Sequence, residues 1–440
     1  MTGSFIMGLA GLSGLLLLIA ARVPIAYAMI LVGVGGISLQ SGPWIVLNQL
    51  KDLAYAQFSN YDLSVLPMFI LMGGLATRCG LSADIFRGAN AWLGRFRGGV
   101  AMAAIAACAG FGAVCGSSTA TASTMGQVAL PELRKYRYSG SLATGTIAAG
   151  GTLGILIPPS VVLIVYAIIV EVNIVTLFAA ALVPGLLAII MFIATVGLYV
   201  YFVPGSGPAG AKVTRAELAA ATLATVPVLV IFGVVIGGIY AGIYNPTAAA
   251  AIGVAMVVAY GLARRRLSLA GLRDGLLETA RTSGMIFLIL LGAELLKIFM
   301  SRAGVPQAAA EMLQTSGLAP MTIMVLIIVV FLILGCLMDS LSMVILAIPF
   351  FWPVVAGLDF GLGPDGTKIW FGIIILVVVE LGLITPPVGL NVFIINAQAR
   401  DVPMRETFKG VMPFFASEVV RITLLVLFPA ISLTLPRLLQ

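Results

Sequence analysis

The sequence contains no histidine and very few charged residues. Of its 440 residues, 9% are charged and 61% are hydrophobic, whereas about 25% of the residues in an average soluble domain are charged. So little charge cannot cover a protein of this length in water. The absence of histidine excludes haem axial histidines, histidine-ligated metals and the serine–histidine pair of many hydrolases. Soluble enzymes, nucleic-acid-binding proteins and secreted disulfide scaffolds are therefore excluded as classes.

Cysteine is also scarce, and a phosphate-binding loop is absent. The four cysteines have no paired spacing and three of them lie in apolar runs, which argues against disulfides and zinc sites. No GxxxxGK[ST] loop occurs in the chain, so the sequence predicts no coupling to ATP through such a loop.

Long apolar runs dominate the chain, whose mean hydropathy is +1.14. At about 20 residues per helical span, the length accommodates roughly a dozen to fourteen crossings of a lipid bilayer and no separate soluble domain. The first run, residues 5–21, has no basic segment before it and predicts a span, not a cleaved signal. The runs lack the period-two alternation of a membrane barrel. The expected fold class is an all-α polytopic membrane protein in an inner, energy-transducing type of membrane.

Basic clusters lie in the connections between apolar runs, at residues 95–97, 134–137 and 264–266. In a soluble protein such clusters can indicate nucleic-acid binding. Between apolar runs they are typical of cytoplasmic anchors of membrane spans, so no nucleic-acid partner is expected.

A polar, Gly/Pro-rich linker at residues 203–217 divides the chain into two halves that share an order of features. Each half has a small-residue break in an apolar stretch, then a return marked by proline, then a Pro-Pro pair in a later apolar stretch. The breaks lie at 112–119 and 335–340, and the pairs at 158–159 and 386–387. A weak internal repeat with matched helix interruptions is typical of secondary transporters.

The runs beside each break are too short to cross a core of about 30 Å at about 1.5 Å per residue. They predict re-entrant helical hairpins at 102–131 and 322–353. Because two consecutive prolines interrupt a helix, broken spans are predicted at 140–171 and 369–398. The expected division is into scaffold helices (1–100 and 218–318), hairpin and broken-helix segments (101–202, which includes a further span, and 319–399), the linker, and a C-terminal span (400–440).

Interrupted backbone leaves polar groups unpaired, and in a membrane it persists only where it is buried in protein or faces water and ions. Carbonyls at a half-helix C-terminus suit a small cation, and N–H groups at an N-terminus suit an anion. The breaks also carry oxygen-bearing side chains, which suit sodium and not transition metals: Ser117, Ser118, Asp339, Ser340, Thr385 and Asn391. Glu380, one turn before the second Pro-Pro pair, is either a direct ion ligand or a group that holds a half-helix to its neighbour.

The segments 66–73, 94–99, 111–121, 154–160 and 382–389 carry a family resemblance. Over essentially its whole length the chain resembles the large membrane subunit of tripartite ATP-independent periplasmic (TRAP) transporters, the dicarboxylate-type M subunit. The resemblance implies a sodium-driven importer in the bacterial inner membrane, with two inverted repeats and an elevator motion. It implies two partners, a small four-helix membrane subunit and a periplasmic substrate-binding protein, and as substrate a small organic anion such as a C4-dicarboxylate, sialic acid or a related carboxylate.

The resemblance also implies site residues. One sodium site is expected at Gly116, Ser117, Ser118 and Gly154, and another at Asp339, Ser340, Thr385 and Gly389. The substrate anion is expected to meet Ser118, Thr121, Pro159, Ser160 and Asn391. One departure is visible at residues 245–250, where an acidic residue usual in the family is replaced by alanine; this segment is expected to be scaffold.

Several alternatives stay open at the level of sequence. A stand-alone ion-coupled carrier of the same hairpin-containing superfamily would need no binding protein. A channel would need a continuous pore, which broken hairpins on a repeat do not favour. An intramembrane hydrolase using Ser117 or Ser118 would need Lys297 as its base, and Glu294 is the simpler partner for that lysine. Asp339 and Glu380 leave proton coupling open, and dicarboxylates, keto acids and sugar acids all remain as substrates.

Overall fold

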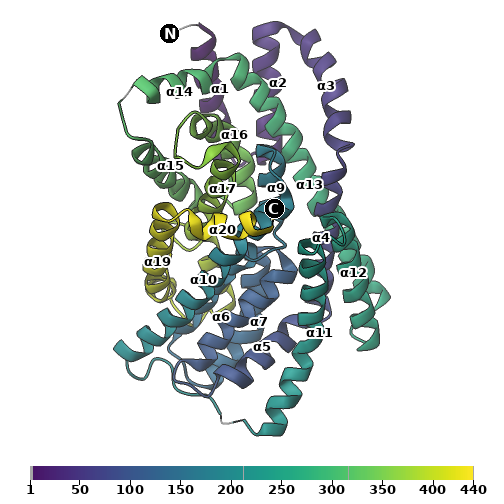
Figure 1. Ribbon diagram of the computed structural model, residues 1–440, viewed down its shortest axis with the longest axis vertical. Helices are drawn as coiled ribbons and strands as arrows, with labels where there is room; N and C mark the ends of the chain where they lie inside the picture. Colours follow the sequence, from purple (N-terminus) through teal and green to yellow (C-terminus); the bar gives the residue numbers. More distant parts are fainter. Residues whose placement is uncertain (1–2, 212, 316, 440) are drawn as a thin grey trace.

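The computed structural model describes residues 3–211, 213–315 and 317–439, and these residues form helices and no strand. Figure 1 shows a first group of helices, in purple and green, along one side of an elongated molecule. The first of them are α1 (Gly3–Ala20), α2 (Ile25–Ser41), α3 (Pro43–Phe58), the 3₁₀ helix η1 (Tyr61–Ser64), α4 (Val65–Arg78) and α5 (Leu81–Leu93). The hairpin and the broken helix of the first half follow α5 and are described below. After them come α10 (Ile174–Phe202), α11 (Arg215–Tyr240), α12 (Pro246–Ala263), α13 (Leu269–Arg302) and α14 (Val305–Thr315). The chain ends with α19 (Met404–Leu427) and α20 (Ala430–Leu439).

The first hairpin, named hairpin 1, consists of α6 (Gly99–Cys115) and α7 (Ser118–Lys135). Gly116 ends α6 with a φ of +65°, a conformation that glycine adopts without strain. Ser117 then begins α7 by accepting a hydrogen bond from the backbone N–H of Ala120. The next two helices, α8 (Gly140–Leu156) and α9 (Val161–Val170), are bent by 44° at the first Pro-Pro pair, and together they are named broken helix 1.

The second half has the same order of elements. Hairpin 2 consists of α15 (Pro320–Gly335) and α16 (Ser340–Ala356), and broken helix 2 consists of α17 (Gly363–Gly382) and α18 (Leu390–Gln398). Asp339 begins α16 by accepting from the backbone N–H of Ser342 at 3.1 Å. Both Pro-Pro peptide bonds are cis.

The hairpin helices are longer than the sequence predicts. Hairpin 1 extends to residues 99–135 and hairpin 2 to 320–356, because Pro131, Pro349 and Pro353 lie inside helices and do not end them. Neighbouring helices in a membrane protein can satisfy the backbone groups that such prolines free. One break was not predicted: α4 and α5 are bent by 67° at Gly80, which has a φ of +72°.

Fewer helices than expected can cross a membrane alone. Six described helices are long and apolar enough, and up to eight spans result if each bent pair counts as one. The expected dozen to fourteen crossings is therefore too high. Four apolar helices, α2, α6, α15 and α16, are shorter than the length of a full span.

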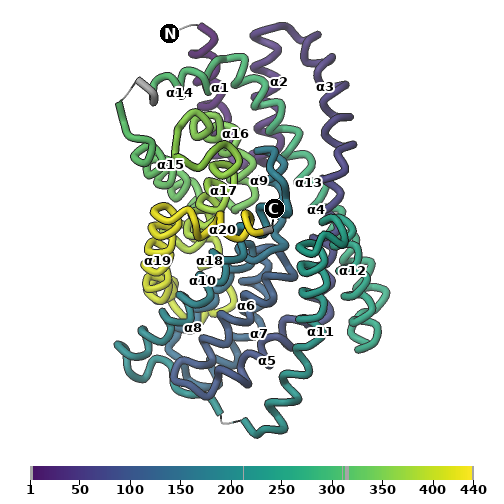
Figure 2. Tube along the Cα trace, viewed as in Figure 1, coloured from purple at the N-terminus to yellow at the C-terminus, as the bar shows by residue number. Residues whose placement is uncertain are grey.

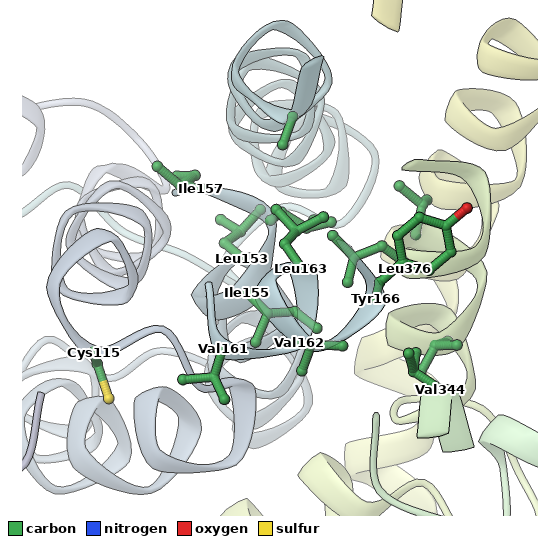
Figure 3. Packing of buried hydrophobic residues seen from close by; sticks show 14 of the residues in the cluster. Cys115, Leu153, Ile155, Ile157, Val161, Val162, Leu163, Tyr166, Val344 and Leu376 are labelled. Carbon is green, nitrogen blue, oxygen red and sulfur yellow. The ribbon is translucent and has the colours of Figure 1, made fainter. Parts of the chain in front are cut away.

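The two halves interlock. The α18 helix of broken helix 2 packs on α7 and α8, and α9 of broken helix 1 packs on α16. Figure 2 shows this mixing of blue and yellow-green segments in the centre of the molecule. In Figure 3, Tyr166 of α9 lies towards Leu376 of α17 and Val344 of α16; its hydroxyl donates to the Lys368 carbonyl at 2.7 Å.

Apolar side chains also cover the outside. Leu198 and Tyr201 on α10, and Leu223 and Leu229 on α11, are exposed. Outward apolar faces of this kind fit a lipid environment.

Candidate ion and substrate site at the helix breaks

The tip of hairpin 1 lies against the first Pro-Pro break. A Cβ atom added to Gly116 would lie 2.8 Å from the carbonyl oxygen of Pro159. Pro158, Pro159 and Ser160 are all buried, and the Ser160 hydroxyl accepts from the N–H of Leu163 to begin α9. Glycine at position 116 therefore allows the tip and the break to meet.

Gly154, four residues before Pro158, allows a second close approach. A Cβ atom there would lie 2.5 Å from Thr121 Oγ1 and 2.6 Å from the Ser117 carbonyl oxygen. Both oxygens therefore face the same small region beside α8. Gly112 of α6 packs against the Gly154 backbone from its other side.

Two buried oxygens near this region have no hydrogen-bond partner, namely Thr121 Oγ1 and Asn391 Oδ1. The amide nitrogen of Asn391 donates to the Ala148 carbonyl at 3.4 Å, which places this side chain beside α8 as well. Buried polar atoms without partners are uncommon in proteins and call for a ligand or a functional role. Hydroxyl, amide and carbonyl oxygens are the donor set that a hard cation prefers, so the residues present fit sodium.

The second break is more open than the first. Pro386 and Pro387 are exposed, while Gly389 is buried with a φ of +64°. The N–H of Asn391 donates to the Leu383 carbonyl at 3.0 Å, and this bond closes the loop. A Cβ atom at Gly389 would lie 3.3 Å from the Thr385 carbonyl oxygen, and the Thr385 hydroxyl donates to the Leu381 carbonyl near the end of α17 at 2.6 Å.

Glu380 joins the two hairpin tips. Ser118 Oγ donates to Glu380 Oε2 at 2.5 Å, and Ser340 Oγ donates to Glu380 Oε1 at 2.6 Å. The Glu380 side chain is fully buried. The sequence left open whether this carboxylate binds an ion or holds neighbouring elements, and the structure shows that it contacts both tips.

A cavity of about 630 Å³ lies between the hairpin tips and helices α4 and α13. Its polar lining residues are Thr77, Arg78, Ser117, Ser118, Thr119, Ser123, Thr124, Gln127, Glu278, Thr279, Thr282, Asp339 and Ser340. Of the residues expected to meet substrate, Ser118 lines this cavity. Thr121, Pro159, Ser160 and Asn391 are buried behind it.

Sequence reasoning missed part of this lining. Ser123 and Gln127 are four residues apart on α7, a spacing that places them on one helix face. The sequence alone could therefore have indicated that these two polar side chains lie on the same side of the helix. Arg78 pairs with Glu278 of α13 at 2.9 Å, and nothing in the local sequence indicates that these two residues meet. In the described part of the chain, no group of three or more acidic or cysteine side chains forms a metal cluster.

The arrangement of helices is similar to that of a solved transporter. The crystal structure of the Alcanivorax borkumensis YdaH transporter aligns with a TM-score of 0.64 at 12% identity, over 89% of this chain and 90% of that one. The hairpins, broken helices and apolar outer faces define a multi-pass α-helical membrane protein.

Sequence comparison identifies the family. Residues 12–431 match the family model described as tripartite ATP-independent periplasmic transporter, DctM component. The C4-dicarboxylate TRAP transporter large permease protein DctM of Pseudomonas aeruginosa is 33% identical over 393 residues, which cover 88% of this chain and 90% of that protein. The sialic acid TRAP transporter large permease protein SiaM of Vibrio cholerae is 28% identical over 428 residues, 97% of each chain. The chain belongs to the DctM family of TRAP transporter large permease subunits, which are transport proteins and not enzymes.

Proposed function

We propose that this chain is the large permease of a sodium-coupled secondary transporter that depends on a binding protein and imports a small organic acid anion. The observation that carries the sodium coupling is the pair of unpartnered buried oxygens beside α8: Thr121 Oγ1 at Gly154, and Asn391 Oδ1, whose amide nitrogen lies near Ala148 and Gly151. A sodium ion satisfies such oxygens without a redox or proton step.

The first proposed sodium site takes ligands from Gly116, Ser117, Ser118 and Gly154, with Thr121 as an additional ligand. The Gly154 contact supports this set, because it brings Thr121 Oγ1 and the Ser117 carbonyl together. The second proposed site takes ligands from the tip of hairpin 2 and from the second break: Asp339, Ser340, Thr385 and Gly389. Asp339 is half-buried at the cavity, so its charge is available to a cation.

Matched contacts in the two halves support a pair of inverted repeats. Gly112 packs against Gly154 in the first half, and Gly335 packs against Gly382 in the second. Gly154 and Gly382 both lie four residues before a Pro-Pro pair. The hairpins thus contact their broken helices at equivalent positions, as expected if one structural unit occurs twice.

The substrate of this transporter is proposed to be a carboxylate that occupies the cavity between the tips and helices α4 and α13. Its hydroxyl and amide lining offers hydrogen bonds to an anion, and Arg78, which pairs with Glu278 at 2.9 Å, places a guanidinium group at the cavity. Relatives of this chain are named for C4-dicarboxylates and sialic acid, and we propose a substrate of this kind.

An elevator motion is proposed for the hairpins and broken helices relative to α4 and α13. The position of the cavity supports it, because the cavity lies at the border between these two groups of helices. The membrane is proposed to be the bacterial inner membrane, and the partners a small four-helix membrane subunit and a periplasmic substrate-binding protein.

A hydrolase reaction is not favoured by the site. Ser118 Oγ donates its hydrogen to Glu380, and Lys297 pairs with Glu294 at 3.4 Å, as the sequence predicted. Lys297 therefore contacts neither tip serine among the contacts described.

The test is uptake of candidate organic acids by proteoliposomes that contain the large and small membrane subunits, with the binding protein added outside. We expect uptake under an inward sodium gradient without ATP, and none when the binding protein is omitted. Uptake by the chain alone would instead indicate a stand-alone carrier, and uptake indifferent to sodium would contradict the proposal.

A further inference from the structure

One buried carboxylate contacts the tips of both hairpins. Glu380 lies on α17, and its two oxygens are each occupied by one serine: Oε2 by Ser118 of hairpin 1 and Oε1 by Ser340 of hairpin 2. The two serines belong to different halves of the chain. They are the first residues of α7 and α16, and both line the cavity.

The direction of these hydrogen bonds constrains the serines. Both hydrogen bonds run from a serine hydroxyl to a carboxylate oxygen, and a serine hydroxyl has a single hydrogen with two acceptor lone pairs. Ser118 and Ser340 therefore use their hydrogens on Glu380. The groups that they offer to anything else are oxygen lone pairs, which attract a cation and repel an anion.

Other charged groups near Glu380 are committed elsewhere. Arg421 donates to Glu418 at 3.0 and 2.5 Å and to the Pro184 carbonyl at 3.1 Å, all within or beside α19. Both residues of that ion pair are buried. Among the described contacts, the serine hydroxyls are thus the hydrogen-bond donors to the Glu380 carboxylate.

We propose that Glu380 is a positioning residue that fixes the two tip serines as cation ligands and ties the two hairpins together. The inference rests on the proposed sodium coupling and deepens it. It assigns Ser118 to sodium and removes it from the donors available to the substrate anion. The anion then takes its hydrogen bonds from other groups of the cavity, such as Ser123, Thr124 and Gln127.

The direct test is Glu380→Gln in the complete transporter. A glutamine amide has one acceptor oxygen and one donor nitrogen, so it can accept from one serine but must donate to the other, whose hydrogen then turns away. We expect the sodium concentration for half-maximal uptake to rise about tenfold, the scale of one hydrogen bond to a charged group. The KM for substrate at saturating sodium should stay within about twofold of the original value.

The matched control is Ser342→Ala. Ser342 lies on α16 close to Ser340, and in the described contacts its hydroxyl makes no bond to Glu380. This variant should retain the original sodium dependence. Thermal unfolding of each purified variant shows whether it is folded.

A double-mutant cycle separates positioning from a general structural effect. Because Glu380 acts through the serines, Glu380→Gln should add little to the sodium defect of a Ser118→Ala, Ser340→Ala double variant. The inference would be overturned if the sodium defects of Glu380→Gln and of the double serine variant multiplied when combined. It would also be overturned if Glu380→Gln left the sodium dependence unchanged.

Ser118→Cys tests the inference even if Glu380→Gln fails to fold. A thiol keeps a hydrogen for Glu380 but replaces the oxygen by sulfur, which is a poor sodium ligand. We expect weaker sodium activation with an unchanged substrate KM. Unchanged sodium activation with an altered substrate KM would overturn the inference. Sodium-independent uptake by the unmodified complex would instead defeat the proposed function itself.

Discussion

The Thr121 hydroxyl oxygen is buried without a hydrogen-bond partner, and an unmet polar group of this kind costs about 1–3 kcal/mol. Thr121→Val keeps the shape of the side chain and removes that cost. We expect the ion-free protein to be as stable as the original or more so, while the sodium concentration for half-maximal uptake rises roughly tenfold. Sodium titrations of uptake and thermal unfolding measure the two effects.

The control for this variant is Thr144→Val. Thr144 is a buried threonine on α8, which packs on the α7 helix that carries Thr121, and its hydroxyl donates to the Gly140 carbonyl at 2.8 Å. The Thr144→Val variant should leave sodium activation unchanged. Equal sodium dependence in Thr121→Val and the unmodified protein would contradict the first sodium site.

Gly154 admits no side chain in this arrangement. In Gly154→Ala the new methyl group would meet Thr121 Oγ1 at 2.5 Å and the Ser117 carbonyl at 2.6 Å, and overpacking of this kind costs about 1–3 kcal/mol. We expect a lower unfolding temperature and loss of sodium-driven uptake. Gly284→Ala, on α13 with no atom within 4 Å of the added Cβ, is the matched substitution and should preserve both properties.

At the residue scale, the sequence identified Glu380 as a candidate but could not identify its partners. Ser118 and Ser340 lie 262 and 40 residues away in the chain. Their meeting depends on how the two hairpins pack. The same reason explains why Arg78 and Glu278, 200 residues apart, were missed.

At the element scale, Asp339 both begins α16 and faces the cavity. Asp339→Asn keeps an acceptor oxygen for the Ser342 N–H and removes the charge, whereas Asp339→Ala removes both. We expect Asp339→Asn to weaken sodium activation at nearly unchanged stability, and Asp339→Ala to lose about 1 kcal/mol of stability as well, the value of a helix N-cap. Identical sodium activation in Asp339→Asn and the unmodified protein would argue against the second sodium site.

Helix ends and breaks were predictable where their cause is local. A Pro-Pro pair and a glycine with positive φ act on the backbone of their own neighbours, so the helix interruptions at Gly116 and at both Pro-Pro pairs could be predicted from the sequence. The ends of α7 and α16 were not, because Pro131 and Pro353 lie inside these helices and do not end them. The bend at Gly80 was missed since a single glycine is a weak signal.

At the scale of the whole molecule, the proposed moving elements are tied to one another. Arg134 of α7 pairs with Asp401, which follows α18, and α9 packs on α16. The group of helices that includes α4 and α13 is held together by contacts of its own. The buried Asp84 of α5, for example, accepts from Arg266 at 2.5 Å and from Tyr260 at 2.6 Å.

Cross-linking tests whether these two groups move relative to each other. Thr119 of hairpin 1 and Thr282 of α13 line opposite sides of the cavity, so a bifunctional reagent joining cysteines at both positions should stop uptake. Ser64 and Thr247, whose hydroxyls are 3.4 Å apart, both lie in the group of helices that includes α4 and α13. A cross-link between these two positions should therefore be tolerated. Cys115 lines the same cavity and is replaced by alanine in both pairs, while the other three natural cysteines are buried. Full uptake after cross-linking 119 to 282 would exclude the elevator motion.

The helix breaks are proposed to bind sodium and to move it together with the substrate. The most direct measurement is entry of radioactive sodium into proteoliposomes holding the complete transporter, with and without substrate-loaded binding protein. We predict sodium entry that requires substrate and is strongly reduced in Thr121→Val at low sodium. Substrate uptake with no accompanying sodium entry would contradict the account.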